Sequence, residues 1–231
     1  MRGVFQRENR SRINLKDQFI YHLDNISLSY GKLKALQRVS LTVNPGDMLF
    51  ITGKSGAGKT SLLNVLSGHL DPSQGKIYGM AEDRFIARVF QDLKLLEDLT
   101  CEENLWYAYD RSIYKSKTEF IADMHELVSL LGIKDRMHLK VRDANGGLKH
   151  KTALIRALLT RPQVLLADEP TASLDKENAH KIFDLLNFYN VKRNLTVVWA
   201  THNRELVKNF PGKIVHIENG KLVYSGHACF I

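Results

Sequence analysis

The chain has 231 residues, of which 44% are hydrophobic and 25% are charged, and its formal net charge is +8. These values suit one large core or two small lobes, and they exclude a low-complexity or fibrous protein. No apolar run approaches the ~20 residues of a membrane-spanning helix, and the N-terminus lacks the apolar stretch of a secretory signal, so we expect a cytoplasmic protein. A basic surface suits an anionic membrane face, a nucleic acid or a nucleotide pool, or it simply keeps the protein soluble.

The first part of the chain predicts a basic extension followed by short strands. Residues 1–25 are polar and rich in arginine, so we expect an N-terminal extension there and a single domain over residues 26–231. Residues 26–30 and 39–43 alternate apolar and polar side chains, which is typical of half-buried strands. The continuous apolar run Met48–Thr52 predicts a fully buried strand.

The middle of the chain predicts a helix and then a helical lobe. Residues 60–67 form the first predicted helix, which Gly68 ends in the left-handed conformation that glycine favours. Between about residues 93 and 145, apolar side chains recur at helical spacing, and Gly132 ends the predicted helix. We expect this segment to be a helical subdomain inserted into the core.

The last third predicts the remainder of a mixed sheet. Residues 164–167 and 195–200 are continuous apolar runs, as parallel central strands require, and a helix is expected between them at residues 177–186. Asn219-Gly220 is a strong hairpin signal between two short strands. The predicted fold class is therefore α/β, with a mixed core sheet.

A phosphate-binding motif follows the buried strand Met48–Thr52. Residues 53–60 match G-x-x-x-x-G-K-[ST] without exception, between a predicted strand and a predicted helix. Such glycines let successive N–H groups turn inward, and the helix N-terminus adds partial positive charge. We expect ATP with Mg²⁺ here, with Lys59 on the β and γ phosphates and the Thr60 hydroxyl on the metal. The expected nucleotide-binding residues of this loop are Gly53, Ser55, Gly56, Ala57, Gly58, Lys59, Thr60 and Ser61.

Two carboxylates lie at the end of the apolar run 164–167. Asp168 is placed to hold Mg²⁺ directly or through water, because a hard cation prefers oxygen ligands. Glu169 is the candidate general base, or water-orienting group, for attack on the γ-phosphate. Acidic strand ends without a role are common in α/β proteins, but a phosphate-binding loop in the same chain favours the catalytic interpretation.

These motifs, in this order, resemble the ATP-binding cassette (ABC) ATPase family over about residues 26–224. The resemblance implies a P-loop NTPase cassette with an N-terminal antiparallel β subdomain. Gln91 is similar to the glutamine that touches Mg²⁺ and relays the nucleotide state to a membrane partner, and His202 is similar to the switch histidine at the γ-phosphate. Tyr30 lies where the family places an aromatic ring against adenine. The implied catalytic residues are Glu169, His202, Gln91 and Lys59, and the implied metal-binding residues are Thr60, Gln91 and Asp168.

The resemblance also implies a head-to-tail dimer, in which ATP lies between the P-loop of one subunit and the signature loop of the other. The family's usual L-S-G-G-Q stands here as Ala144-Asn145-Gly146-Gly147-Leu148. The amide of Asn145 can still donate a hydrogen bond, whereas Leu148 cannot and would leave a polar partner unpaired at a cost of ~1–3 kcal/mol. We expect slower hydrolysis or weaker dimerisation, with nucleotide binding retained. The residues expected across the dimer are Asn145, Gly146, Gly147, Ser173 and Asp175.

Within the family, residues 46–58 and 90–104 resemble the cell-division branch FtsE. That likeness implies an FtsX-like integral membrane permease as partner, control of cell-wall hydrolases, and a peripheral position on the cytoplasmic face of the inner membrane. From the resemblance to the ABC family we also expect a homodimer in the ATP state. We expect no nucleic-acid partner, because the chain has one P-loop and lacks the paired cassettes or long insertions of nucleic-acid-linked ABC proteins. Two alternatives stay open: an ATPase of a lipoprotein-release or export transporter, and a slow ATP-dependent binding switch.

Overall fold

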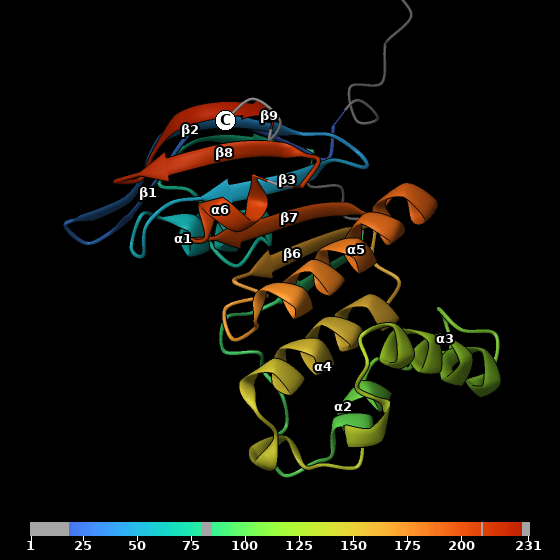
Figure 1. The fold of residues 1–231 in the computed structure, drawn as a ribbon. Coiled ribbons are helices and arrows are strands. Elements are labelled where there is room, and N and C mark those ends of the chain that lie inside the picture. The colour runs from blue at the N-terminus through green and yellow to red at the C-terminus, as the bar shows by residue number, and fades with distance from the viewer. Residues whose placement is uncertain (1–18, 80–84, 209, 228–231) are drawn as a thin grey trace, which may run out of the picture.

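The computed structural model describes residues 19–79, 85–208 and 210–227. Its strands form two sheets, and helices cover the larger one on both faces (Figure 1). The strands are β1 (Tyr21–Tyr30), β2 (Leu33–Val43), β3 (Met48–Thr52), β4 (Gln74–Tyr78), β5 (Ile86–Val89), β6 (Val164–Asp168), β7 (Thr196–Thr201), β8 (Lys213–Glu218) and β9 (Lys221–His227). The helices are α1 (Lys59–Leu66), α2 (Cys101–Trp106), α3 (Lys117–Leu130), α4 (Gly146–Leu159), α5 (Lys176–Arg193) and α6 (Arg204–Val207), with short 3₁₀ helices at η2 (Lys134–Arg136) and η3 (Val141–Asp143).

The larger sheet confirms the predicted mixed core. Its strand order is β5-β6-β7-β3-β8-β9, with parallel pairing throughout except between β8 and β9. All five residues of β3 are buried, as its apolar run predicts for a strand with neighbours on both sides. The smaller sheet, in the order β2-β1-β4, is antiparallel, which agrees with the expected β subdomain.

Alternate residues of the central strands face two separate hydrophobic clusters. Phe50 and Trp199 face the cluster that contains α4 and α5. Ile51 and Leu166 face the cluster formed with α1 and the strands β1 and β2. Because successive side chains of a strand point to opposite faces, the apolar runs fill both clusters at once. The helix α1, which follows the phosphate-binding motif, is therefore fixed between the two sheets.

The helical lobe contains α2 and α3 and packs against α4 (Figure 1). The hydroxyl of Ser116 caps α3 by accepting a hydrogen bond from the backbone N–H of Glu119 at 3.1 Å. The predicted stripe on this helix is buried, and Gly132 follows its end with φ +63°. The expected helical subdomain is thus present, and its packing surface extends into α4.

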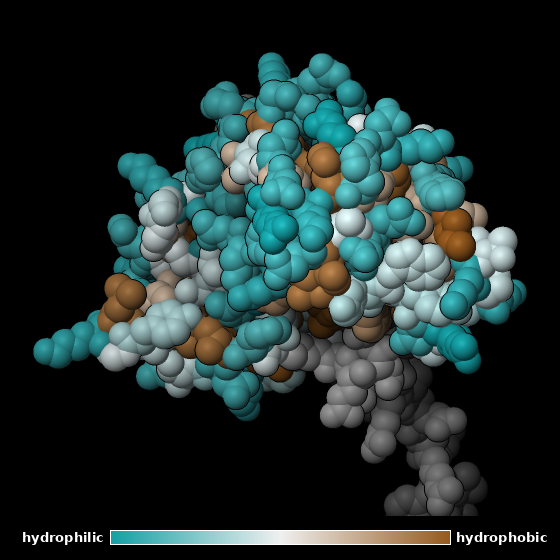
Figure 2. Space-filling view, turned by 90° about the horizontal axis from the view of Figure 1, so that it is seen from below, coloured by the Kyte–Doolittle hydropathy of each residue, from teal (hydrophilic) through white to brown (hydrophobic). Residues whose placement is uncertain are grey.

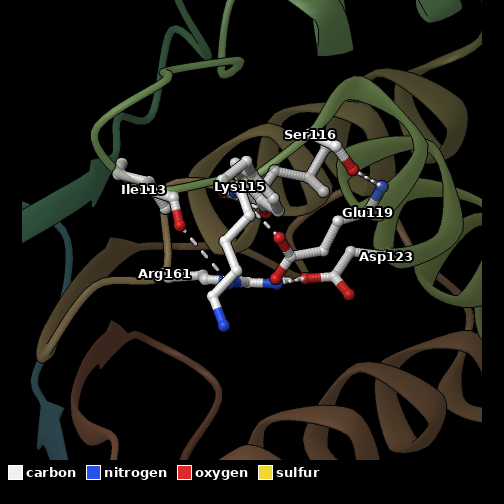
Figure 3. Close-up of polar contacts among 8 residues, drawn as sticks. Ile113, Lys115, Ser116, Glu119, Asp123 and Arg161 are labelled. Carbon is white, nitrogen blue, oxygen red and sulfur yellow. Dashed lines mark hydrogen bonds and ion pairs between the residues drawn. The ribbon is translucent and has the colours of Figure 1, made fainter.

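Arg161 ties this lobe to the segment that follows α4 (Figure 3). One Nη of Arg161 lies 2.8 Å from carboxylate oxygens of both Glu119 and Asp123, which belong to α3. Its guanidinium also lies 4.2 Å from the ring centroid of Tyr114, whose hydroxyl donates to the carbonyl of Leu159 at 2.6 Å. Burial raises the pKa of Tyr114 to about 12. These contacts fix the orientation of α3 relative to the core.

The structure extends several of the elements that the sequence predicts, among them β1, β2 (from Leu33) and α5. Strand β1 begins at Tyr21 rather than at residue 26, because Tyr21 and Leu23 are buried and pair with Val43 and Leu41 of β2. The last residues of the expected extension therefore belong to the sheet, and residues 1–18 lie outside the described part of the chain. Helix α5 is longer than predicted at both ends.

The surface carries little continuous apolar area on the side of the helical lobe. Figure 2 views the molecule from below Figure 1 and shows small hydrophobic patches separated by hydrophilic side chains. In the described ranges, no helix combines the length and apolar character that crossing a membrane requires.

Candidate functional site

The predicted site residues follow the carboxyl ends of parallel strands that are neighbours in the larger sheet. Gly53 follows β3, Gln91 lies two residues after β5, Glu169 follows β6 and His202 follows β7. Carboxyl ends of parallel strands meet at one edge of a sheet, which is where open α/β sheets bind ligands. Segments that are far apart in the sequence therefore converge on one cleft.

That cleft has a volume of about 870 Å³. It brings together the predicted residues Tyr30, Ser55, Gly56, Gly58, Lys59, Thr60, Ser61, Gln91, Asp168, Glu169 and His202. Gly53 and Ala57 do not line it, and both are buried parts of the loop itself. Tyr30 is 45% exposed at the wall of the cleft, which leaves its ring available for stacking.

The lysine side chain of the P-loop binds the backbone of the same loop. Lys59 Nζ donates to the carbonyl oxygens of Gly53 at 2.9 Å and Lys54 at 3.1 Å. A Cβ added at Gly58, where φ is +111°, would lie 2.5 Å from the carbonyl oxygen of Ala35. The glycine is therefore required here by backbone conformation and by space.

The hairpin turn between β8 and β9 also supports this loop. This contact was not predicted from the sequence. The N–H of Gly220 donates to the carbonyl of Ala57 at 2.9 Å. Gln37 Nε2 donates to the carbonyl of Asn219 at 2.7 Å, so β2 and the turn are joined at the same place. Asn219, Gly220 and Gln37 all line the cleft. The Asn-Gly signal identified the turn, but not its contact with a loop more than 150 residues earlier.

Asp168 has the properties of a metal ligand. It is 1% exposed, and in the described part of the structure neither carboxylate oxygen has a hydrogen-bond partner of good geometry. Burial raises its pKa, and the nearby Thr60 hydroxyl and Arg88 oppose that rise. Buried carboxylates are stable when a charge or donor satisfies them, and Mg²⁺ prefers such oxygen ligands. The residues present therefore fit Mg²⁺ between Asp168 and the phosphate-binding loop.

Glu169 joins the P-loop to the segment after β7. Its Oε1 lies 3.6 Å from Lys59 Nζ and 2.9 Å from His202 Nδ1. Glu169 adopts φ +51°, a conformation rare for residues other than glycine, and its N–H donates to the carbonyl of Ala200 at 2.9 Å. The Glu169 carboxylate is 11% exposed and the His202 ring 62% exposed. This arrangement holds a carboxylate at the edge of the cleft, beside a cation and an imidazole.

The residues predicted to act across a dimer lie in a second cleft of about 670 Å³. Asn145, Gly146, Gly147, Ser173 and Asp175 all line it. Its walls also carry three cations that the sequence did not single out, namely Arg136, Lys151 and Lys181. The two clefts have no lining residue in common, so one chain presents two separate clefts.

The altered signature loop is accommodated within the chain. Asn145 Oδ1 accepts the N–H of Leu148 at 2.9 Å and so caps α4, which leaves the amide NH₂ as a donor. Leu148 is only 3% exposed and belongs to the hydrophobic core. The leucine thus points into an apolar cluster, and the expected cost of an unpaired polar partner stays a prediction.

The comparisons with known proteins agree with this fold and site. Residues 36–172 match the family model described as ABC transporter, so the chain belongs to the ABC transporter family and carries its ATPase domain. It is 27% identical to the ATP-binding cassette MJ0796 in a dimeric post-hydrolysis structure bound to ADP and Pi, with a TM-score of 0.78 over 91% of this chain and 100% of that one. The nucleotide-free cassette of another ABC transporter is 26% identical, with a TM-score of 0.76 over 90% and 91%. The ABC cassette fold and its cofactors, ATP and Mg²⁺, are thereby shown.

The curated relatives point away from the branch that we expected. The methionine import ATP-binding protein MetN of Streptococcus agalactiae is 33% identical over 90% of this chain and 64% of its own length. MetN of Bacillus subtilis is 32% identical over 85% of this chain and 61% of its own length. The chain thus spans less than two thirds of the length of these two relatives. They give no support to the FtsE assignment.

Proposed function

We propose that the chain hydrolyses Mg·ATP and uses the cycle to drive a membrane partner. The observation that carries this proposal is the position of Glu169, which lies between Lys59 and His202 and next to the unsatisfied carboxylate of Asp168. Glu169 would orient and deprotonate the attacking water. His202 would hold that carboxylate and contact the γ-phosphate.

The other residues of the cleft bind and orient the nucleotide. Lys59 would leave its backbone carbonyls, or share them, to contact the β and γ phosphates. Tyr30 would stack on adenine, and inward N–H groups of the loop would hold the phosphates. Thr60, Gln91 and Asp168 would hold Mg²⁺, which would neutralise phosphate charge when bound.

A complete site requires two chains. The nucleotide cleft and the signature cleft are separate on one chain, so we propose a head-to-tail homodimer in the ATP state. In that dimer the Asn145 amide and the N–H groups of Gly146 and Gly147 face the partner's γ-phosphate, and Ser173 and Asp175 lie at the interface. The cations around this cleft favour an anionic ligand. The similar cassette MJ0796 is dimeric in a structure bound to ADP and Pi, which supports the pairing of two chains.

The membrane partner is proposed from the relatives. Because the curated relatives are methionine import proteins, we propose a permease that takes up an amino acid or similar small solute, rather than an FtsX-like protein. The chain would then lie on the cytoplasmic face of the cell membrane. This fits the net charge of +8, since anionic lipids attract basic surfaces.

The test of this proposal combines assembly and transport. Purified Glu169→Gln protein should form a dimer of twice the monomer mass in Mg·ATP and stay monomeric in ADP. Cells that produce Glu169→Gln in place of the native chain should take up labelled methionine at background rates, while uptake of an unrelated solute is unchanged. Normal methionine uptake with a normal ATP dimer would reject the substrate class alone. Failure of the ATP dimer would reject the paired site.

A further inference from the structure

Arg88 lies on the same face of the sheet as the proposed metal ligand Asp168. It pairs with Leu166 in the parallel register of β5 and β6. Paired residues of neighbouring strands point to one face, and residues two apart on a strand do so as well, which places Arg88 and Asp168 together on that face. This is the face covered by α1, since Leu166 belongs to the cluster that contains that helix.

The guanidinium has two contacts and makes no hydrogen bond to Asp168. Nη1 donates to the hydroxyl of Ser67, the C-cap of α1, at 3.0 Å. The guanidinium carbon lies 4.5 Å from the ring centroid of Phe90, which precedes Gln91. Arg88 Nε is buried and, in the described part of the chain, has no hydrogen-bond partner. Ser67 at the end of α1 and Phe90 directly after β5 thus fix the position of the guanidinium.

A partly buried arginine and a buried carboxylate therefore face one region, and each has a polar atom with no hydrogen-bond partner in the described part of the chain. Burial lowers the pKa of Arg88, and the charge of Asp168 opposes that change. The two groups share one face of the sheet and interact through space, without a hydrogen bond. Neither the catalytic proposal nor the family resemblance uses this arginine.

We propose that Arg88 is a positioning residue that acts on the metal site as a fixed counter-charge to Asp168. In the metal-free site it supplies part of the positive charge that Mg²⁺ otherwise brings, and in the metal-bound site it repels the cation. Arg88 therefore reduces the extent to which Mg²⁺ strengthens ATP binding. This inference rests on the proposed Mg·ATP site. The quantity to measure is the ATP dissociation constant in EDTA divided by the ATP dissociation constant in saturating Mg²⁺.

The test compares two variants that differ in charge. Arg88→Gln keeps a donor for Ser67 but removes the charge, whereas Arg88→Lys keeps the charge. Both are made in the Glu169→Gln background, and ATP affinity is measured by equilibrium titration at pH 8 in EDTA and in Mg²⁺. Removal of the charge should raise the ratio about fivefold, and Arg88→Lys should change it less than twofold. A ratio of equilibrium constants does not depend on the fraction of active protein.

Two controls separate this role from a structural one. Arg142→Met, which removes an exposed arginine paired with Asp98, should leave the ratio unchanged. In an Asp168→Asn background, Arg88→Gln should change the ratio by clearly less, because the attraction between Arg88 and the Asp168 carboxylate is gone. An unchanged ratio for Arg88→Gln, or an equal change in the Asp168→Asn background, would overturn the inference. If the protein with native Arg88 shows no effect of Mg²⁺ on ATP affinity, the proposed metal site itself fails.

Discussion

Oε1 of Glu169 lies 2.9 Å from Nδ1 of His202, although the two residues come from segments that follow different strands. The strands β6 and β7 are neighbours with parallel pairing, so their carboxyl ends place the two side chains side by side. The contact joins a half-exposed imidazole to a nearly buried carboxylate. It gives the candidate base a fixed orientation toward the cleft.

Removing this contact should affect turnover much more than binding. His202→Ala is expected to lower ATP turnover about 100-fold, because Glu169 loses the group that orients it and the γ-phosphate loses a contact. ATP affinity should change less than about threefold, since the P-loop makes the main phosphate contacts. Phosphate release and equilibrium ATP binding measure the two quantities. His138→Ala, at an exposed position of the helical lobe, is the control. Equal losses of affinity and turnover would contradict this role.

The cap at Asn145 predicts a difference between two small substitutions. Asn145→Ala removes both the acceptor for the N–H of Leu148 and the free amide donor, so it should lower stability by about 1 kcal/mol and weaken the ATP dimer. Asn145→Ser keeps an acceptor and a hydroxyl donor, and it should preserve both properties. Chemical unfolding and native mass measurement in Mg·ATP test these outcomes. Full dimerisation of Asn145→Ala would show that the amide does not contact the partner's nucleotide.

The hydroxyl of Tyr114 should stabilise the fold at pH 8 and lose this effect at alkaline pH. Tyr114→Phe should lower the free energy of unfolding by about 1–2 kcal/mol at pH 8, because the carbonyl of Leu159 loses its donor. The folded pKa of about 12 exceeds the unfolded value of about 10. The neutral phenol thus contributes stability below pH 10, and that contribution is lost as the pH rises toward 12. The difference between the two proteins should therefore shrink between pH 8 and pH 11 in urea titrations. A constant difference would contradict the raised pKa.

The ion pair between Glu119 and Arg161 should stabilise the fold at neutral pH and lose this effect at acid pH. The hydrogen bond from Arg161 lowers the pKa of Glu119 below its usual value. Its contribution is therefore present above the unfolded pKa of about 4.3 and is lost as the pH falls through the lower folded value. The native protein should lose stability more steeply below about pH 4.5 than Glu119→Gln. Glu126→Gln, an exposed substitution on the same helix, should follow the native curve. Parallel curves for all three proteins would reject the coupling.

Local signals were sufficient to predict much of the fold and the nucleotide cleft. The residues 53–60 form one contiguous motif, and Asp168 and Glu169 directly end an apolar run, so both features are visible without knowing the tertiary structure. The hairpin at Asn219 is local in the same sense, because its turn conformation depends on adjacent residues.

Features that depend on pairing between distant strands could not be predicted in this way. Strand β1 begins at Tyr21 because β2 covers it, although the preceding residues are polar. The support of Ala57 by Gly220 and the common face of Arg88 and Asp168 depend on strand register. The burial of Leu148 depends likewise on how α4 packs against the lobe. A motif assigns a residue type to a loop, whereas only the packing decides which way the side chain points.

The most direct test of Glu169 as the catalytic carboxylate is the rate of phosphate release from Mg·ATP by the purified protein and by Glu169→Gln. We expect measurable turnover by the native chain, a loss of at least about 100-fold in Glu169→Gln, and ATP affinity that is unchanged within about threefold. Equal phosphate release by the two proteins, with ATP bound tightly by both, would show that Glu169 is not the catalytic carboxylate.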